Sequence, residues 1–316
     1  MRIFIQQLPR FPAPTTTGQV FDQVIAIAQG KVVGVHARAA AEYVGAGASL
    51  DSAALVRIAR DAAREAGALV LAGWRKHPVA EHKGRVDLVT RFDRESETLL
   101  NDRLTAATPF PVVGEEHGGR PAPGPDALTW YVDPIDGPTN FVHGHPFWCV
   151  SVGLLAGTRP VLGVVVAPSL GVEWVGVAAG QATRNGERCR VSEVSRLDDA
   201  LLATGFPYDR RTSPDNNFDA FVAIKQKCQA VRRCGSAALD LCLVADGTYD
   251  GYWEGKLKVW DLAAGAALVV AAGGRVSDYG GQGADVTAGR VVATNGGIHD
   301  ALVAELAEFA DLNLRR

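Results

Sequence analysis

Hydrophobic periodicity first becomes regular at residues 51–74. Apolar or small residues recur there three, four or seven positions apart, a spacing that places them on one face of a helix. They are Leu55, Ile58, Ala62, Ala66, Leu69 and Gly73. The pattern predicts an amphipathic helix with Asp51 as its N-cap. Residues 85–104 predict a short strand or turn, followed by a second amphipathic helix that starts near Asp93.

Short apolar segments separated by turn residues follow the two helices. They are residues 110–119, 128–137, 148–155, 159–168 and 172–180. Their length and β-branched content predict buried strands, the last three as antiparallel neighbours. After about residue 198, strand-like and helical segments alternate, which predicts a layered α/β half. The fold class is therefore α/β, with an α+β half at residues 49–195 and an α/β half at residues 196–316.

Residues 1–48 have no clear period. Proline and threonine cluster in LPRFPAPTTTG, and an alanine- and glycine-rich run follows. Three interpretations stay open: a flexible arm, a small added element, or an upstream extension from a misplaced start. The segment is predicted to be an N-terminal extension of unknown role.

Composition excludes several protein classes. The chain has 316 residues, 47% of them hydrophobic, which is enough for a large core. Its 32 basic and 35 acidic residues give a net charge of -3 without long blocks of one sign, so nothing predicts a nucleic-acid or membrane surface. The five cysteines never form a C-x-x-C pair, which favours free thiols in a cytoplasmic protein. No apolar run suits a signal peptide or a membrane span.

Acidic residues stand at the ends of several predicted apolar segments. They are Glu115, Glu116, Asp133, Asp136 and Asp261. Asp133 and Asp136 can turn toward one point, because Pro134 fixes the turn and Gly137 lets the backbone bend. Clustered carboxylates are costly unless a cation compensates them. An acidic set without matching histidines or cysteines favours Mg²⁺ over Zn²⁺.

Each acidic motif also has a purely structural interpretation. Asp133 and Asp136 alone could form a solvated turn, and the Gly-Glu-Glu triplet could be an exposed loop. Asp93 could act only as a helix N-cap, and Asp261 only as a first-turn acid that favours the helix dipole. The order of the four motifs along the chain, with their flanking residues, favours the metal site.

This order resembles the inositol monophosphatase family of Mg²⁺-dependent, lithium-sensitive phosphatases. The matching motifs are DLVTRFD (residues 87–93), GEE (114–116), DPIDG (133–137) and WDLAAG (260–265). TGFPYD, GSAALDL and LKVWDLAAG are most similar to bacterial members. The resemblance implies a layered αβαβα sandwich of the inositol monophosphatase / fructose-1,6-bisphosphatase type. Members are usually homodimers, and Lys83 and Arg85 would belong to a mobile loop over the metals.

The resemblance also implies a role for each motif residue. Two or three Mg²⁺ ions would be held by Glu115, Asp133, the Ile135 carbonyl, Asp136 and Asp261. Catalytic support would come from Asp93, which orients or deprotonates the attacking water, and from Glu116. The substrate side would be lined by Asp136, Gly137, Gly235, Ser236, Ala237 and Glu254. Paired metals in such sites lie about 4 Å apart and clamp the phosphate while water attacks in line.

Pro138 departs from the family pattern, which has threonine after Asp-Gly. In the family that hydroxyl partners the acid at Asp93, and proline has neither a hydroxyl nor a backbone N–H. In one interpretation Pro138 simply begins a helical turn, where proline is favoured, and Thr139 supplies the hydroxyl. In the other, the chain is a weakened catalyst that keeps its metal site.

Further residues near these motifs have two interpretations each. His143 and His145 could bind metal or phosphate, although loop packing is favoured. Arg232 and Arg233 could face the substrate or a partner subunit, or form a plain surface pair. Trp253 replaces a smaller aromatic residue beside Glu254 and is expected to reshape the pocket.

The predicted activity is an inositol-phosphate phosphatase, a phosphoric monoester hydrolase that converts myo-inositol 1-phosphate to myo-inositol and phosphate. The alternative substrates are histidinol phosphate, fructose 1,6-bisphosphate and 3'-phosphoadenosine nucleotides. The alternative from another class is a weakly active regulatory or interaction protein on the same scaffold. The expected partners are a small phosphorylated substrate and a second copy of the chain.

Overall fold

The computed structural model describes residues 23–28, 31–37, 51–76, 78–82, 88–283 and 285–309. Asp87 of the first motif, Lys83 and Arg85 lie outside the described residues. Within the predicted N-terminal extension, β1 (Gln23–Ala28) and β2 (Lys31–Ala37) form an antiparallel hairpin. The described part of this extension is therefore a small β element.

Two long helices open the main body. Helix α1 (Ser52–Gly73) begins after Asp51, whose Oδ1 accepts a hydrogen bond from Ala54 N at 2.7 Å, as predicted. Helix α2 (Arg91–Ala107) has Thr90 as its N-cap, so the prediction of Asp93 as a possible cap is wrong. Asp93 occupies the third helical position and completes a capping box with Thr90. The two-residue difference matters because it turns the Asp93 side chain back toward the strand before the helix.

Strands β5 to β11 form a seven-stranded sheet in the order β11-β10-β9-β8-β7-β6-β5. Their bounds are β5 Val112–Gly114, β6 Leu128–Asp136, β7 Cys149–Ala156, β8 Arg159–Ala167, β9 Val172–Val177, β10 Ala182–Arg184 and β11 Glu187–Cys189. Only β5 and β6 pair in parallel; the other neighbours are antiparallel, as the sequence predicted for β7, β8 and β9. A short separate pair, β3 (Ala80–His82) and β4 (Leu88–Thr90), precedes α2.

A five-stranded sheet forms in the C-terminal half, in the order β13-β12-β14-β16-β15. Its strands are β12 Leu201–Thr204, β13 Ala230–Arg232, β14 Gly251–Gly255, β15 Arg275–Ser277 and β16 Arg290–Thr294. The remaining helices are α3 Pro138–Val142, α4 Phe218–Lys225, α5 Ala237–Ala245, α6 Val259–Ala271 and α7 His299–Leu306. The 3₁₀ turns are Leu197–Asp199, Val286–Ala288 and Ala307–Phe309.

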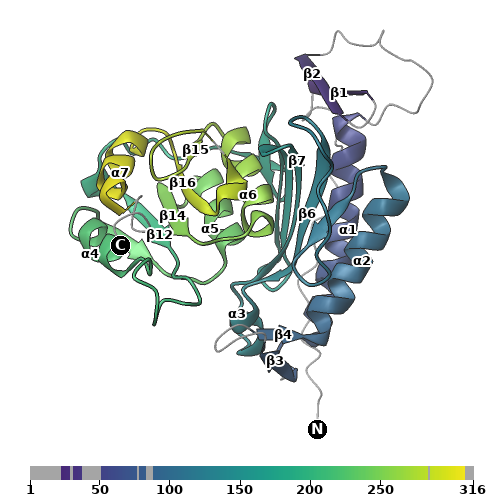
Figure 1. The fold of residues 1–316 in the computed structure, drawn as a ribbon, viewed down its shortest axis with the longest axis horizontal. Helices are drawn as coiled ribbons and strands as arrows, with labels where there is room; N and C mark the ends of the chain where they lie inside the picture. Colours follow the sequence, from purple (N-terminus) through teal and green to yellow (C-terminus); the bar gives the residue numbers. More distant parts are fainter. Residues whose placement is uncertain are drawn as a thin grey trace.

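Five layers result, as predicted. Helices α1 and α2 cover one face of the seven-stranded sheet, and α5 and α6 lie between this sheet and the five-stranded one (Figure 1). Helices α4 and α7 cover the far face of the five-stranded sheet (Figure 1). The boundary predicted near residue 195 separates the two sheets but not the core, because the middle helices pack into one hydrophobic cluster with strands of both sheets.

Small residues bring α6 directly onto the seven-stranded sheet. A Cβ atom added at Gly153 on β7 would lie 2.6 Å from the Cβ atom of Ala263, and one added at Gly163 on β8 would lie 2.1 Å from the Ala264 carbonyl oxygen. Side chains at either glycine would therefore push the helix away. The close approach fixes the first turn of α6, which carries Asp261, against the strand ends.

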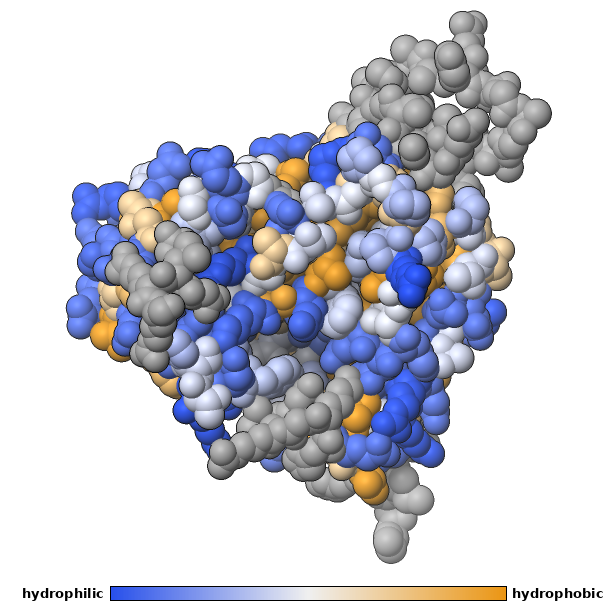
Figure 2. All heavy atoms as spheres, viewed as in Figure 1, coloured by the Kyte–Doolittle hydropathy of each residue, from blue (hydrophilic) through white to orange (hydrophobic). Residues whose placement is uncertain are grey.

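Hydrophilic residues cover most of the face shown in Figure 2, and hydrophobic ones occur in small groups. Within the residues that the structure describes, none of the helices combines the length and the apolar character needed to cross a bilayer.

Candidate metal centre and active site

A cleft of about 840 Å³ lies where the strand ends of both sheets meet the first turns of α5 and α6. Its lining includes the carboxylates that the sequence singled out: Glu115, Asp133, Asp136 and Asp261. It also includes the residues expected on the substrate side: Gly235, Ser236, Ala237 and Glu254. The sequence motifs are therefore brought together in one cavity, although they are spread over more than half of the chain.

A distortion at the end of β6 turns two aspartates to the same side. In a regular strand, residues three positions apart point to opposite faces. The pairing of β6 with β7 shifts register between Asp133 and Asp136, at the segment that contains Pro134. Both aspartates consequently line the cleft, as the sequence predicted from Pro134 and Gly137. Asp133 Oδ1 accepts a hydrogen bond from Ile135 N at 2.9 Å, which closes the turn locally.

The loop after β5 is held by a carboxylate that sequence reasoning missed. Glu97 on α2 is 2% exposed and accepts hydrogen bonds from Glu116 N at 2.7 Å and His117 N at 2.6 Å. A Cβ atom at Gly114 would lie 2.2 Å from Glu97 Oε1, so glycine is needed where β5 ends. Glu97 thereby sets the backbone that carries Glu115. Its signal in the sequence was an acid four residues after Asp93, on the buried face of the helix.

Asp261 comes from the C-terminal half. It is the third residue of α6, and its Oδ2 accepts a hydrogen bond from Lys258 N at 2.7 Å. Burial and the neighbouring Asp136 raise the pKa of Asp261. Burial also raises the pKa of Asp133, followed by the negative charges of Glu115, Asp136 and Asp261. The four carboxylates therefore repel one another across the junction of the two sheets.

The chemistry of these carboxylates suits a hard divalent cation, but their positions in this structure do not form a coordination site. Among the residues that the structure describes, no three His, Cys, Asp or Glu side chains converge on one point as a ready cation site. Asp133 and Asp261 instead accept hydrogen bonds from backbone N–H groups. All the ligand atoms that these carboxylates offer are oxygens, which suits Mg²⁺. A bound cation would also relieve the repulsion among the carboxylates. Asp133 and Asp261 each have a second carboxylate oxygen that the hydrogen bond to the backbone does not use.

Asp136 connects the carboxylate end of the cleft with the first turn of α5. Its Oδ2 accepts hydrogen bonds from Ser236 Oγ at 2.7 Å and from Ala238 N at 2.6 Å. Burial raises the pKa of Asp136 to about 6, although these hydrogen bonds lower it. A negative charge is also favoured at this position by the helix dipole. The side chain thus fixes α5, and with it the predicted substrate side, relative to β6.

Two tight turns meet beside Asp136. Gly137 and Gly235 have φ angles of 97° and 91°, a backbone region that favours glycine. A Cβ atom at Gly137 would lie 3.1 Å from the Gly235 carbonyl oxygen. Asn140 Nδ2 holds the turns together by donating to the carbonyl oxygens of Phe147 at 2.6 Å and Cys234 at 2.8 Å.

A family model described as the inositol monophosphatase family matches residues 51–312, which is most of the chain. The chain belongs to the inositol monophosphatase family. Members of this family are metal-dependent phosphatases that act on small phosphorylated substrates.

Similar proteins in several organisms carry two kinds of name. An inositol-1-monophosphatase of Synechocystis is 41% identical over 253 residues, covering 80% of this chain and 88% of that protein. A protein named Nus factor SuhB from Pseudomonas aeruginosa is 37% identical over 268 residues, covering 83% and 99%. The solved inositol monophosphatase of Anabaena superposes with a TM-score of 0.73 at 39% identity, covering 80% and 95%.

Three of the residues expected to act in this family site lie outside the lining of the cleft: Asp93, Glu116 and Ile135. Asp93 is 2% exposed, and its Oδ2 accepts hydrogen bonds from Thr90 N at 2.8 Å and Thr90 Oγ1 at 2.7 Å. Burial raises the pKa of Asp93 to about 6, and the charge of Glu116 adds to this rise. Thr139, by contrast, is exposed and lines the cleft next to Pro138.

Other residues that the sequence raised are also placed by the structure. His143 and His145 are exposed and do not line the cleft, so the structure places them in a loop outside it. The expectation that Trp253 reshapes the pocket is wrong. Strand alternation points it away from Glu254 into the core under α4 and α7, where its Nε1 donates to Asn217 Oδ1 at 3.0 Å. Arg233 lines the cleft, whereas Arg232 does not.

The substrate end of the family site contains a second buried acid, Asp240, which the sequence did not single out. It is 2% exposed, lines the cleft, and its Oδ1 has no hydrogen-bond partner. Burial raises the pKa of Asp240, and the charge of Glu254 adds to this rise. Burial likewise raises the pKa of Glu254 to about 7, against the hydrogen bond from Tyr252. An aspartate within the otherwise apolar segment AALDLCLVA was its signal.

Gly205 makes the room that the Glu254 carboxyl group occupies. A Cβ atom at Gly205 would lie 1.9 Å from Glu254 Oε2. We expect Gly205→Ala to displace Glu254 and to lower the free energy of unfolding by about 1–3 kcal/mol, the usual cost of overpacking. Gly255→Ala is the matched control, because its Cβ atom would meet nothing nearer than 3.6 Å. Urea denaturation of both variants checks this, and equal stability would contradict it.

Proposed function

We propose that the protein hydrolyses an inositol monophosphate, with myo-inositol 1-phosphate as the substrate and Mg²⁺ as the metal. The observation that carries this proposal is the composition of one cleft. Four carboxylates line it together with Glu254 and the first turn of α5. A phosphate bound through metal at the carboxylates would leave its alcohol portion near Glu254.

The carboxylate end supplies the metal ligands in this proposal. Glu115, Asp133, Asp136 and Asp261 would hold two or three Mg²⁺ ions, with the Ile135 carbonyl as a further ligand. When bound, such ions neutralise phosphate charge and lower the pKa of a coordinated water. Mutual repulsion among these carboxylates supports the assignment, because it leaves a strong negative potential to be compensated.

The chain's own residues would then orient the reactants. Asp93 would help position the attacking water or accept its proton. Glu116 would keep Asp93 and the loop after β5 in place, and Thr139 offers a hydroxyl at the cleft. Attack in line with the leaving group needs position and charge rather than a covalent intermediate.

The opposite end would select the alcohol. Ring hydroxyls would meet the Glu254 carboxyl group, which accepts or donates hydrogen bonds according to its protonation. Ser236 and Ala237 line the same cleft, where the positive φ angles of Gly137 and Gly235 let the backbone come close. A polyol with several hydroxyls satisfies these groups better than an alkyl alcohol.

A substrate panel tests the proposal. Phosphate release would be measured from inositol 1-phosphate, histidinol phosphate, fructose 1,6-bisphosphate, 3'-phosphoadenosine 5'-phosphate and glycerol 2-phosphate, with Mg²⁺ and with EDTA. We expect release that requires Mg²⁺ and a kcat/KM that is highest for the inositol ester. Preference for another ester would keep the phosphatase and change its substrate.

A second candidate function is that of a weakly active regulatory or interaction protein. It is favoured by the similarity to the Pseudomonas protein named Nus factor SuhB and by Pro138 at the cleft. Folded protein that binds Mg²⁺ but releases phosphate from no ester of the panel would support this candidate and reject hydrolysis.

We also propose a homodimer in the cytoplasm. All five cysteines are free in the described structure, which suits a reducing compartment. Sedimentation equilibrium of the purified chain checks the dimer, and a single species of one-chain mass would reject it.

A further inference from the structure

The segment that follows β12 forms a wall of the cleft. We call residues 206–217 the wall segment. Phe206, Pro207, Tyr208 and Arg210 from this segment all line the cleft, as does Glu254. The wall segment has no regular secondary structure before α4, so its position depends on contacts with other parts of the chain.

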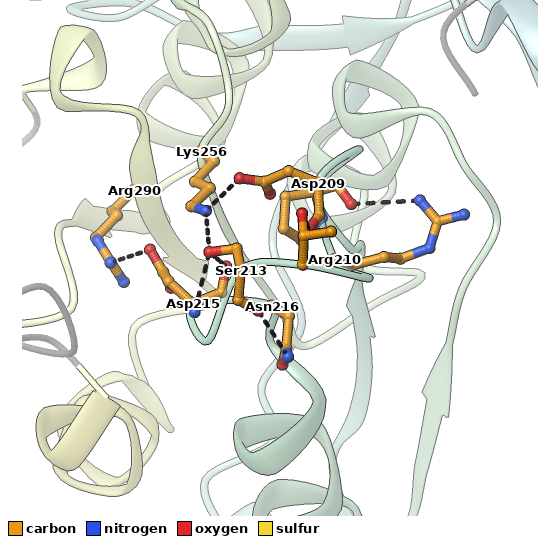
Figure 3. Close-up of polar contacts among 9 residues, drawn as sticks. Asp209, Arg210, Ser213, Asp215, Asn216, Lys256 and Arg290 are labelled. Carbon is orange, nitrogen blue, oxygen red and sulfur yellow. Dashed lines mark hydrogen bonds and ion pairs between the residues drawn. The ribbon is translucent and has the colours of Figure 1, made fainter. Parts of the chain in front are cut away.

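Lys256 provides the principal contact of this kind. It follows Glu254 by two residues and has a φ angle of 62°, a conformation that non-glycine residues rarely adopt. Its Nζ lies 2.7 Å from Asp209 Oδ2 and 2.6 Å from Ser213 Oγ. Figure 3 shows the ammonium group between these two residues of the wall segment. The strained backbone aims the side chain across to the wall.

A second basic side chain, Arg290, also contacts the wall segment. Arg290 Nη2 on β16 lies 2.6 Å from Asp215 Oδ2, and both side chains are largely buried. Asp215 N donates to Ser213 Oγ at 3.2 Å, which joins the two ion pairs into one chain of contacts (Figure 3). Arg290 therefore holds Asp215 near the end of the wall segment, and Lys256 holds Asp209, which lies between the cleft-lining residues Tyr208 and Arg210.

We propose that Lys256 is a positioning residue that sets the separation between the wall segment and Glu254, and so selects for leaving groups that fill this space. The inference rests on the proposed function. Lys256 belongs to the same strand end as Glu254, so its contacts link the acid that would bind the alcohol to the wall opposite. In Figure 3 the Arg210 side chain extends away from the Lys256 contacts, and its Nη1 donates to the Pro207 carbonyl oxygen at 3.3 Å.

A stabilising role alone would not account for this arrangement. Asp209 is 52% exposed and Lys256 is 29% exposed, and ion pairs of such exposure contribute little to global stability. The position of the wall segment is a different quantity, because a substrate binds only to the fraction of molecules in which the wall is in place. Loss of the ammonium group should therefore change KM for the substrate more than it changes the free energy of unfolding.

The test compares Lys256→Met with wild type, using inositol 1-phosphate and the smaller glycerol 2-phosphate with Mg²⁺. We expect KM for the inositol ester to rise about tenfold, with kcat within about twofold, since two charge-assisted hydrogen bonds to the wall are lost. KM for glycerol 2-phosphate and inhibition by inorganic phosphate should stay unchanged. In Lys256→Arg, KM for the inositol ester should return most of the way to the wild-type value. The matched control is Lys227→Met, which removes an exposed ion pair with Glu305.

A second variant separates the ammonium group from the backbone. Glycine suits the left-handed conformation at this position better than lysine, so Lys256→Gly should fold at least as well. It should show the same rise in KM. Equal KM values for the inositol ester in wild type, Lys256→Met and Lys256→Gly would overturn the inference. A wild type that hydrolyses neither ester would instead reject the proposed function.

Discussion

Replacement of Asp133 by asparagine is expected to remove Mg²⁺-dependent phosphate release and, in the same protein, to raise the melting temperature in EDTA. Asp133 is 2% exposed, and Glu115, Asp136 and Asp261 all act on its charge. Loss of this carboxylate would remove a shared metal ligand and lower kcat at least about 10²-fold. It would also relieve repulsion in the metal-free protein, which we expect to raise the melting temperature by at least about 2 °C.

The two effects of Asp133→Asn have opposite signs, which makes the prediction specific. Asparagine keeps an oxygen that can accept the hydrogen bond from Ile135 N, so the turn at the end of β6 is preserved. Asp126→Asn is the matched control, because its carboxylate is 53% exposed and pairs only with Arg159 among the described residues. Phosphate release and calorimetry measure the two effects. A less stable Asp133→Asn protein would contradict the repulsion, and full activity would contradict the metal site.

Replacement of Pro138 by threonine is expected to raise kcat about 10²-fold, the lower range for a general acid–base contribution. Pro138 lines the cleft as the first residue of α3, immediately after Gly137. Threonine would place a hydroxyl where the family pattern has one. Proline restricts the unfolded chain, so its loss should lower the free energy of unfolding by about 0.4–1 kcal/mol. Steady-state kinetics with inositol 1-phosphate and Mg²⁺ provides the measurement.

Substitution of Thr139 is the control for the expected gain in kcat. If its hydroxyl replaces the missing one, Thr139→Val should lower kcat in the natural chain. The same substitution should have little effect together with Pro138→Thr, and a double-mutant cycle measures this difference. An unchanged kcat in Pro138→Thr would show that the hydroxyl is dispensable, and the interpretation of Pro138 as a helix-starting residue would then be sufficient.

Local sequence patterns predicted the layers well because each pattern arises within one element. The spacing of Leu55, Ala62 and Ala66 places them on one helix face, and all three are buried in α1. Strand β6 was likewise read from one continuous apolar segment, and all of its residues are buried. The N-terminus of α2 was displaced by two residues, because the capping box uses Thr90 as well as Asp93.

The residues that position the site could not be predicted in this way, because their partners are distant in the sequence. Glu97 accepts hydrogen bonds from residues 19 and 20 positions away. Lys256 reaches Ser213 across 43 positions, and no periodic pattern relates them. Trp253 was misjudged because its neighbour Glu254 suggested a shared pocket, whereas strand alternation sends the two side chains to opposite faces. The gathering of several motif residues at one cleft was predicted; the long-range contacts that support them were not.

The close packing of α6 on the seven-stranded sheet also affects how the chain is made. Strands β5 to β11 precede α6 in the sequence, so a ribosome releases the whole sheet before the helix that covers its inner face. During that interval Gly153 and Gly163 present a bare apolar surface, later covered by Ala263 and Ala264. We therefore expect the nascent protein to be prone to aggregation until α6 has been synthesised and packed on the sheet.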